Sequence, residues 1–202
     1  MALSRRFFLL GTLGLPGCAA LNTLNDAATP LATFALQPVS VATQRARSSR
    51  TMLVLEPTAP AAIATDRILI KPQPLSVTYL PDARWADAVP QMLQSILIQS
   101  LADSGAIGFV GAQGAGPVPD TVLLTRIDAF EVNVLADGTY QVQVSLDLTV
   151  LRDRDQRVLG SRRSAQSLTI SNDRPEVISQ AFQQLLNDLL PAAVAWVAST
   201  AG

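Results

Sequence analysis

The chain of 202 residues contains no histidine, a single cysteine, Cys18, and a single lysine, Lys71. The lack of histidine removes the commonest general base and the commonest metal ligand. One cysteine cannot form an internal disulfide. No paired carboxylates, nucleophile–base set or metal-ligand cluster stands out in the sequence either. We therefore expect no catalytic residues, no metal site and no bound cofactor, in a protein that acts by binding.

An excess of positive charge is also absent. The chain has 15 basic and 16 acidic side chains, for a formal net charge of −1. This balance gives no indication of nucleic-acid binding. Hydrophobic residues make up 49% of the sequence, which favours a packed domain over a disordered chain.

The amino terminus has the layout of a secretory signal. Arg5 and Arg6 precede an apolar run over residues 7–15, too short to span a bilayer, which takes about 18 residues or more. The run ends in Leu15-Pro16-Gly17-Cys18. This resembles a bacterial lipobox, in which the thiol receives diacylglycerol, the chain is cut before the cysteine, and the new amine is acylated. An ordinary signal with a chance cysteine is the weaker alternative.

Two details of this region bear on the route and the destination. Residues 4–10 resemble the twin-arginine export pattern, although any signal needs positive charge there, so that route and the general one stay equally open. Ala19 follows Cys18 where an inner-membrane retention signal of the enterobacterial kind would place Asp. We therefore expect the lipid-anchored protein at the periplasmic face of the outer membrane.

The remaining chain divides into a tether and one domain. Residues 1–17 form the signal, residues 18–32 a small-residue, polar, lipidated tether, and residues 33–202 a single domain. Short apolar or β-branched runs bounded by prolines predict the first four strands. These are expected at Thr33–Leu36, Thr51–Leu55, Arg67–Lys71 and Leu75–Leu80, with Val77 and Tyr79 alternating in the last.

Helical periodicity predicts two main helices. The first lies within Ala86–Asp103, with Asp87 as its cap, Pro90 in its first turn, and Trp85 packing into the core at its start. The second opens at residues 173–176, with Asp173 as its cap, Pro175 in the first turn and Glu176 in the capping-box position. Pro191 is expected to kink or end it.

Strict alternation of apolar and polar residues over residues 140–150 predicts a half-buried strand in a meander. A two-residue Asp137-Gly138 turn would place apolar residues of the two strands on opposite faces. A three-residue loop over residues 136–138, with Gly138 left-handed, pairs Val132 with Val142. This places the apolar residues of both strands on the same, buried face, so we expect the three-residue loop. We also expect a bulge near Asp128, and a last strand over residues 157–170.

Two loops are candidates for a contact surface. Gly111–Pro119 is glycine-rich but lacks the Gly-Lys-Ser/Thr ending of a phosphate-binding loop, so we interpret it as a flexible loop. Arg152–Asp155 has alternating charges, typical of a solvated hairpin tip. Contact residues concentrate on loops held by a rigid sheet, and these two are therefore the best candidates for meeting a partner.

Together, the lipobox, an early Phe-x-Leu strand, Arg67-Ile68, Tyr79 followed by Arg84-Trp85-Ala86, and the meander with its final helix resemble the ABC-type transport auxiliary lipoproteins. The resemblance covers roughly Thr33 to Trp196. It implies an α+β fold: one mostly antiparallel sheet with two main helices on one face, like the amino-terminal domain of the Tol system's propeller protein. Polar strand faces and single apolar helix stripes favour the same layering.

The resemblance also implies a non-catalytic partner of an ABC permease, its ATPase and an Mce-domain protein, which together move lipid and maintain the outer membrane. A homo-oligomer is compatible with it. A structural or assembly lipoprotein of the outer envelope, unrelated to a transporter, is the alternative. A third class, an envelope hydrolase, would need a mechanism without histidine.

Overall fold

The structure, a computed structural model, describes residues 31–41 and 48–202. Its elements within these residues are strands β1 (Ala32–Phe34), β2 (Thr51–Val54), β3 (Arg67–Gln73), β4 (Ser76–Trp85), β5 (Phe109–Gly111), β6 (Thr121–Val134), β7 (Tyr140–Arg152) and β8 (Arg157–Ile170), helices α2 (Val89–Asp103) and α3 (Pro175–Ala201), and the 3₁₀ turn η1 (Asp153–Asp155). Cys18 lies outside the described residues.

The long strands β6, β7 and β8 form an antiparallel meander, as predicted. Val132 lies opposite Val142, and both side chains are fully buried. The three-residue loop is confirmed: the N–H of Leu135 donates to the carbonyl of Thr139, and Gly138 has φ 82°. The register shifts between Ile127 and Ala129, so the bulge at Asp128 is confirmed as well. Burial therefore decided the register of this hairpin.

The other edge of β6 is shared by two shorter strands. β2 runs parallel to its first part, with Met52 opposite Thr121, and β3 runs parallel to its last part, with Ile70 opposite Val132. β5 extends the sheet beyond β2, while β4 and then β1 extend it beyond β3. The long ladders are antiparallel and the short ones at the amino-terminal strands are parallel.

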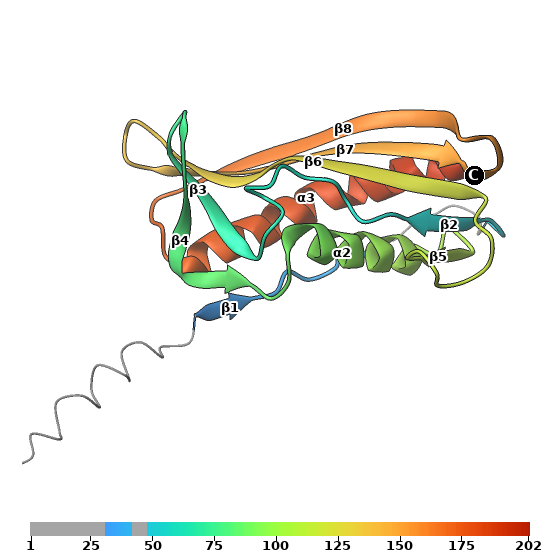
Figure 1. Ribbon diagram of the computed structural model, residues 1–202, viewed down its shortest axis with the longest axis horizontal. Coiled ribbons are helices and arrows are strands. Elements are labelled where there is room, and N and C mark those ends of the chain that lie inside the picture. The colour runs from blue at the N-terminus through green and yellow to red at the C-terminus, as the bar shows by residue number, and fades with distance from the viewer. Residues whose placement is uncertain (1–30, 42–47) are drawn as a thin grey trace, which may run out of the picture. The chain divides into compact units, whose positions relative to one another are not determined.

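Both helices cover the same face of this sheet, and the α+β architecture is as expected (Figure 1). α3 packs beneath β7 and β8, and α2 lies beside α3 and near β2 and β5. The Gln94 side chain ties α2 to the sheet by donating to the carbonyl of Val54 at 3.0 Å. α3 approaches β8 so closely that a Cβ on Gly160 would lie 3.3 Å from the ring of Trp196. The likeness to the Tol domain stays a prediction.

Three aromatic rings join the two layers at the centre of the core. Phe130 of β6 stacks on Phe182 of α3 with ring centroids 4.4 Å apart. Trp85, at the end of β4, packs edge-on against both rings, at 5.8 and 5.2 Å. Each side chain is no more than 2% exposed. The predicted burial of Trp85 is confirmed, and this residue ends β4 shortly before α2 begins at Val89.

The starts of both helices differ from expectation. Ala88 and Arg174 are the N-cap residues, and neither makes a side-chain capping bond, so the expected caps Asp87 and Asp173 are wrong. At α3 the reason is Pro175: a residue before proline is driven to extended backbone, and Arg174 has ψ 136°. The cap therefore falls one residue later than Asp173.

Pro191 does not end α3, which continues to Ala201. The helix buries apolar residues on both sides of this proline, so packing against the sheet holds the turn that lacks one hydrogen bond. These residues are Leu185, Leu186, Leu189, Leu190, Ala193, Val194 and Val197.

The β3–β4 hairpin differs from the expected strands because it extends past the sheet. Gln73 pairs with Ser76, and the preceding contacts with β6 stop at Lys71. Leu75 and Val77, expected in an ordinary strand, are exposed as a result. β4 also continues to Trp85, five residues beyond the expected end at Leu80.

Candidate functional site

The sheet brings both predicted contact loops to one end of the domain. β2 and β6 are parallel, so the residues that precede them lie at the same end of the sheet. These residues are Arg50 and the segment 118–120. β7 is antiparallel to β6, with Arg152 opposite Thr121, so the β7–β8 turn returns to this place. We call this region, formed by Arg50, loop 111–120 and turn 152–155, the loop end.

Asp120 and Thr51 hold the loop end together. The Asp120 carboxylate accepts a hydrogen bond from the Thr51 N–H at 2.8 Å and one from the Thr51 hydroxyl at 3.1 Å. The Thr51 N–H bond, above all, lowers the pKa of Asp120 below its usual value, followed by the hydroxyl bond. The N–H of Asp153 donates to the Asp120 carbonyl at 2.9 Å, which fixes the β7–β8 turn to the same point.

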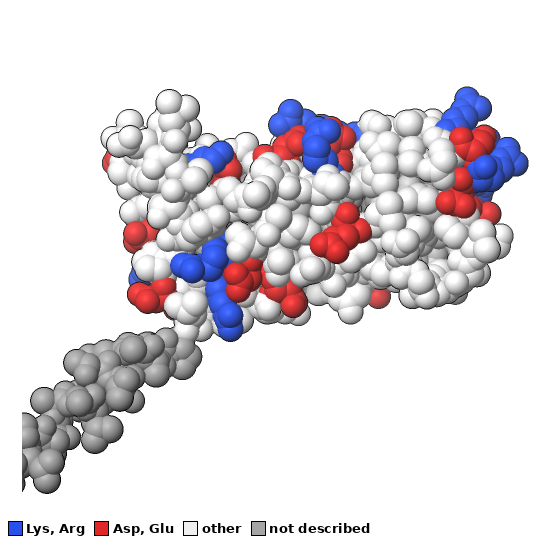
Figure 2. Space-filling model, viewed as in Figure 1, with Lys and Arg blue, Asp and Glu red and all other residues white. Residues whose placement is uncertain are grey.

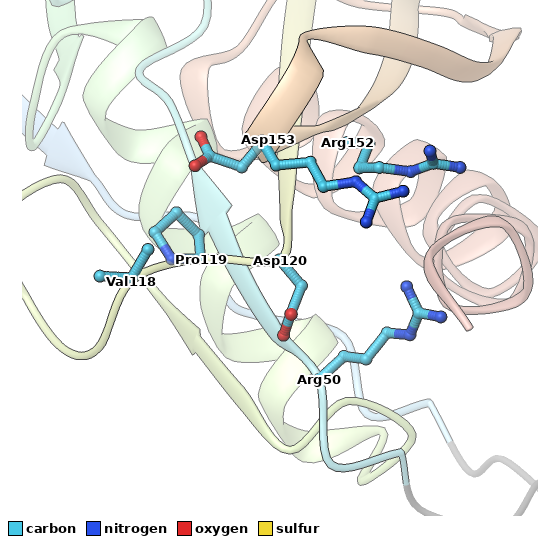
Figure 3. Close-up of a pocket in the computed structure, with 7 residues that line it drawn as sticks. Arg50, Val118, Pro119, Asp120, Arg152 and Asp153 are labelled. Atoms are coloured by element: carbon cyan, nitrogen blue, oxygen red, sulfur yellow. The ribbon is translucent and has the colours of Figure 1, made fainter.

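A pocket of about 560 Å³ opens between these segments (Figure 3). It is lined by Arg50, Val118, Pro119, Asp120, Arg152, Asp153 and Arg154. Arg152 lies 3.3 Å from Asp155, which holds its guanidinium group. Figure 3 shows the side chain of Arg50 rising toward the same side as Arg152. The space-filling view shows a cluster of both charges at this end (Figure 2).

A second hollow of about 360 Å³ adjoins the first and shares Val118, Pro119 and Asp153 with it. The glycine-rich loop forms its wall by wrapping around Phe109. Gly116 has φ 108°, and a Cβ there would lie 2.2 Å from the Phe109 ring. Glycine is therefore required by close approach to an aromatic ring, in place of the phosphate binding that such loops serve elsewhere.

Val118 is 85% exposed in this setting, so the loop end combines an apolar side chain with guanidinium and carboxylate groups. Such a surface can bind a protein segment through one apolar contact and several charged hydrogen bonds. Within residues 31–41 and 48–202, no three His, Cys, Asp or Glu side chains group as metal ligands. No helix among those residues is long and apolar enough to cross a membrane.

A second charged cluster lies on the outer face of the meander. Arg126 contacts Asp128 at 2.7 Å and Asp147 at 3.1 Å, and Arg163 lies 3.8 Å from Asp128. The bond from Arg126 lowers the pKa of Asp128. Its charges are mutually paired across three strands, so we interpret it as support for the sheet and not as a binding site.

Sequence reasoning found the two loops but missed Arg50 as a pocket residue, and missed the Thr51–Asp120 bond. Arg45 and Arg47, which precede Arg50 in the sequence, lie outside the described residues. The signal that could have placed Arg50 is the parallel pairing of β2 with β6. It has no local pattern in the sequence, because the two strands are far apart in the chain.

Comparison with known proteins identifies the class. Residues 34–193 match the family model described as ABC-type transport auxiliary lipoprotein component. The chain belongs to this family. It is a membrane-anchored envelope lipoprotein that serves as an auxiliary component of ABC-type transport.

Solved structures share the fold. A crystal structure of a Xanthomonas campestris protein is 25% identical, with TM-score 0.75, over 83% of this chain and 95% of that one. Another crystal structure, of an uncharacterized protein, is 16% identical, with TM-score 0.64, over 86% and 99% of the two chains. A hypothetical protein of Chlamydia trachomatis is 11% identical, with TM-score 0.52, over 76% and 98%. None of the curated proteins compared matches this chain.

Proposed function

We propose that this auxiliary lipoprotein serves an Mce-type lipid transporter that maintains the outer membrane. In this proposal it is anchored at the periplasmic face of the outer membrane through lipids on Cys18. It binds an Mce-domain protein and so supports the ABC permease and ATPase of the same system. The observation that carries the proposal is the family match over residues 34–193.

The loop end is the proposed surface for the partner. Its two loops are far apart in the sequence and are brought together by the antiparallel pairing of β6 with β7, while the parallel pairing of β2 with β6 adds Arg50. It is hollowed, charged and carries exposed Val118, and its loops are held by hydrogen bonds at Thr51 and Asp120. A loop surface positioned by a rigid sheet is the usual place for a binding function.

The protein is proposed to be non-catalytic. Neither hollow at the loop end contains histidine, cysteine or lysine, and Lys71 is paired with Glu131 elsewhere in the sheet. The arginines there are always charged, so they can bind carboxylate groups but cannot act as general bases. The partner, and not a substrate, then determines what the protein does.

Genetic interaction tests this assignment. Deleting the gene should weaken the envelope barrier to the same degree as deleting the gene for the system's permease, and the double deletion should be no worse. Additive defects would place the protein in a separate pathway and would favour a structural or assembly lipoprotein of the outer envelope.

A further inference from the structure

An uncharged finger projects from the domain at the β3–β4 hairpin. We define the finger as residues 72–78, all of which are exposed. Leu75 at its turn is fully exposed, and Val77 is 55% exposed. No charged residue occurs between Lys71 and Asp82. Figure 2 shows this projection as a group of white atoms above the β3–β4 end of the domain, without the charged groups seen elsewhere.

The backbone of the finger is unsuited to accepting another strand. The contacts of β3 with β6 stop at Lys71, so the finger continues beyond the sheet. Pro72 and Pro74 have no N–H to donate, and prolines at a sheet edge block the addition of a further strand. Any contact that the finger makes must therefore use its side chains.

The finger is too small for a stable protein–protein interface, which buries about 800 Å² on each partner. It offers two aliphatic side chains on a narrow tip, without the aromatic or arginine anchors that such interfaces favour. Binding to a lipid bilayer does not require a surface of complementary shape. Moving two aliphatic side chains from water into the bilayer is favourable, and the lipid anchor already holds the protein close to it.

The finger lies at the end of the domain where the chain from the lipid anchor enters. β1 pairs in parallel with Ala83–Trp85 of β4, at the opposite end of that strand from Val77. Figure 1 shows β1 and the β3–β4 hairpin toward the same end of the domain, with the tip of the hairpin pointing away from β1. The 13 residues that follow Cys18, up to Leu31, span at most about 45 Å when extended. The loop end lies at the other end of the same domain (Figure 1).

We propose that the finger inserts Leu75 and Val77 into the bilayer that anchors the protein, and so fixes how the domain and its loop end face the membrane. This inference rests on the lipid anchor of the proposed function. The anchor supplies attachment, and the finger supplies a fixed orientation, since attachment through one lipidated residue does not by itself set the direction in which the domain faces.

Single fluorescent labels test the insertion. Cys18 is acylated in the mature protein, so a cysteine placed at Leu75→Cys or Val77→Cys is the only free thiol. Val158→Cys is the matched control, because Val158 is 56% exposed and is the second residue of β8, near the loop end. The lipidated full-length protein is labelled with nitrobenzoxadiazole in phosphatidylethanolamine–phosphatidylglycerol vesicles. Some of these vesicles contain nitroxide-bearing lipids.

Both finger labels should shift their emission to shorter wavelength and be quenched by the nitroxide lipids, while the label at position 158 should show neither effect. Vesicles that carry the protein without quenching at either finger position would overturn the proposal. So would quenching of the finger labels no stronger than at position 158. Protection of the finger only after an Mce-domain protein is added would identify a protein contact instead.

This test is separate from that of the transporter assignment. A finger that inserts in a protein that binds no Mce-domain partner would leave the insertion intact and overturn the assignment. A partner that binds a protein whose finger stays in water would do the reverse.

Discussion

The ammonium group of Lys71 lies 2.8 Å from the Glu131 carboxylate, across the parallel β3–β6 pair. Lys71 is the only lysine of the chain. Glu131 is the only buried acidic residue in the described part, with its side chain 8% exposed. The pair lies where β3 joins the edge of β6, next to Ile70 and Val132, which are opposite each other. It therefore joins the segment that carries the finger to the long meander.

Replacing one member of this pair should cost more than replacing both. Lys71→Met leaves a buried carboxylate without its partner and should lower the free energy of unfolding by about 1–3 kcal/mol. The double variant Lys71→Met/Glu131→Leu should recover part of that loss, since an apolar pair avoids the desolvation of both charges. Urea unfolding of the three proteins measures this. Additive losses would contradict a direct coupling.

The register of the hairpin gives a second prediction. Val142→Asp places a carboxylate at a fully buried position and should lower the free energy of unfolding by at least about 3 kcal/mol. Ser167→Asp, on the exposed face of β8, should change it little. Ser167 is a better control than Gln143, because Gln143 lies opposite Glu131 and a carboxylate there would meet a like charge. Equal losses for Val142→Asp and Ser167→Asp would contradict the register.

The lowered pKa of Asp120 predicts that the stability of the protein depends on pH. Its pKa is lower in the folded protein than in the unfolded chain, so the ionised carboxylate stabilises the fold above its unfolded pKa. That contribution is lost as the pH falls through the lower folded pKa. Asp120→Asn should therefore be less stable than the natural protein at pH 7, and the difference should shrink below about pH 4.

Glu56→Gln is the control for this pH dependence. Glu56 is exposed, and among the described residues its side chain forms neither a hydrogen bond nor an ion pair. Melting temperatures at several pH values separate the two variants. A difference between natural protein and Asp120→Asn that stays constant from pH 7 to pH 3 would contradict the role of the Thr51–Asp120 bond.

The anchor itself is tested at Cys18. Cys18→Ser removes the thiol that receives the lipid, so the protein should be released from membranes or accumulate with its signal uncut. One acyl chain alone binds a membrane only weakly, at about 10⁴ M⁻¹, so the several chains of a lipoprotein are needed for stable attachment. Membrane fractionation on a sucrose gradient measures this, and the natural protein should sediment with the outer membrane. A Cys18→Ser protein that remained a processed membrane protein would contradict the lipobox.

Local patterns in the sequence predicted the parts of the fold that depend on neighbouring residues. The meander followed from strict alternation around Val142 and from the glycine in the turn, and β8 was predicted with its observed bounds, Arg157–Ile170. Non-local pairing could not be predicted in this way. Neither the shared edge of β6 nor the placing of Arg50 and Asp153 around one pocket leaves a periodic signal in the sequence. The finger results from where β3 stops pairing with β6.

The predicted helix caps were wrong for a related reason. The sequence offers Asp173 as a good cap, but the steric effect of Pro175 on Arg174 decides where α3 begins. At Pro191, tertiary packing outweighs the local effect of the proline, because the buried residues on both sides of it keep the helix intact.

Purification of the protein's complex tests the central claim most directly. The tagged, lipidated protein is extracted from envelope membranes in mild detergent, and its partners are identified by mass spectrometry. We predict that an Mce-domain protein co-purifies, and that Arg154→Glu at the loop end reduces its yield at least tenfold. Arg174→Glu, an exposed arginine at the start of α3, should leave the yield unchanged. Absence of any Mce-domain protein from the complex of the natural protein would contradict the account.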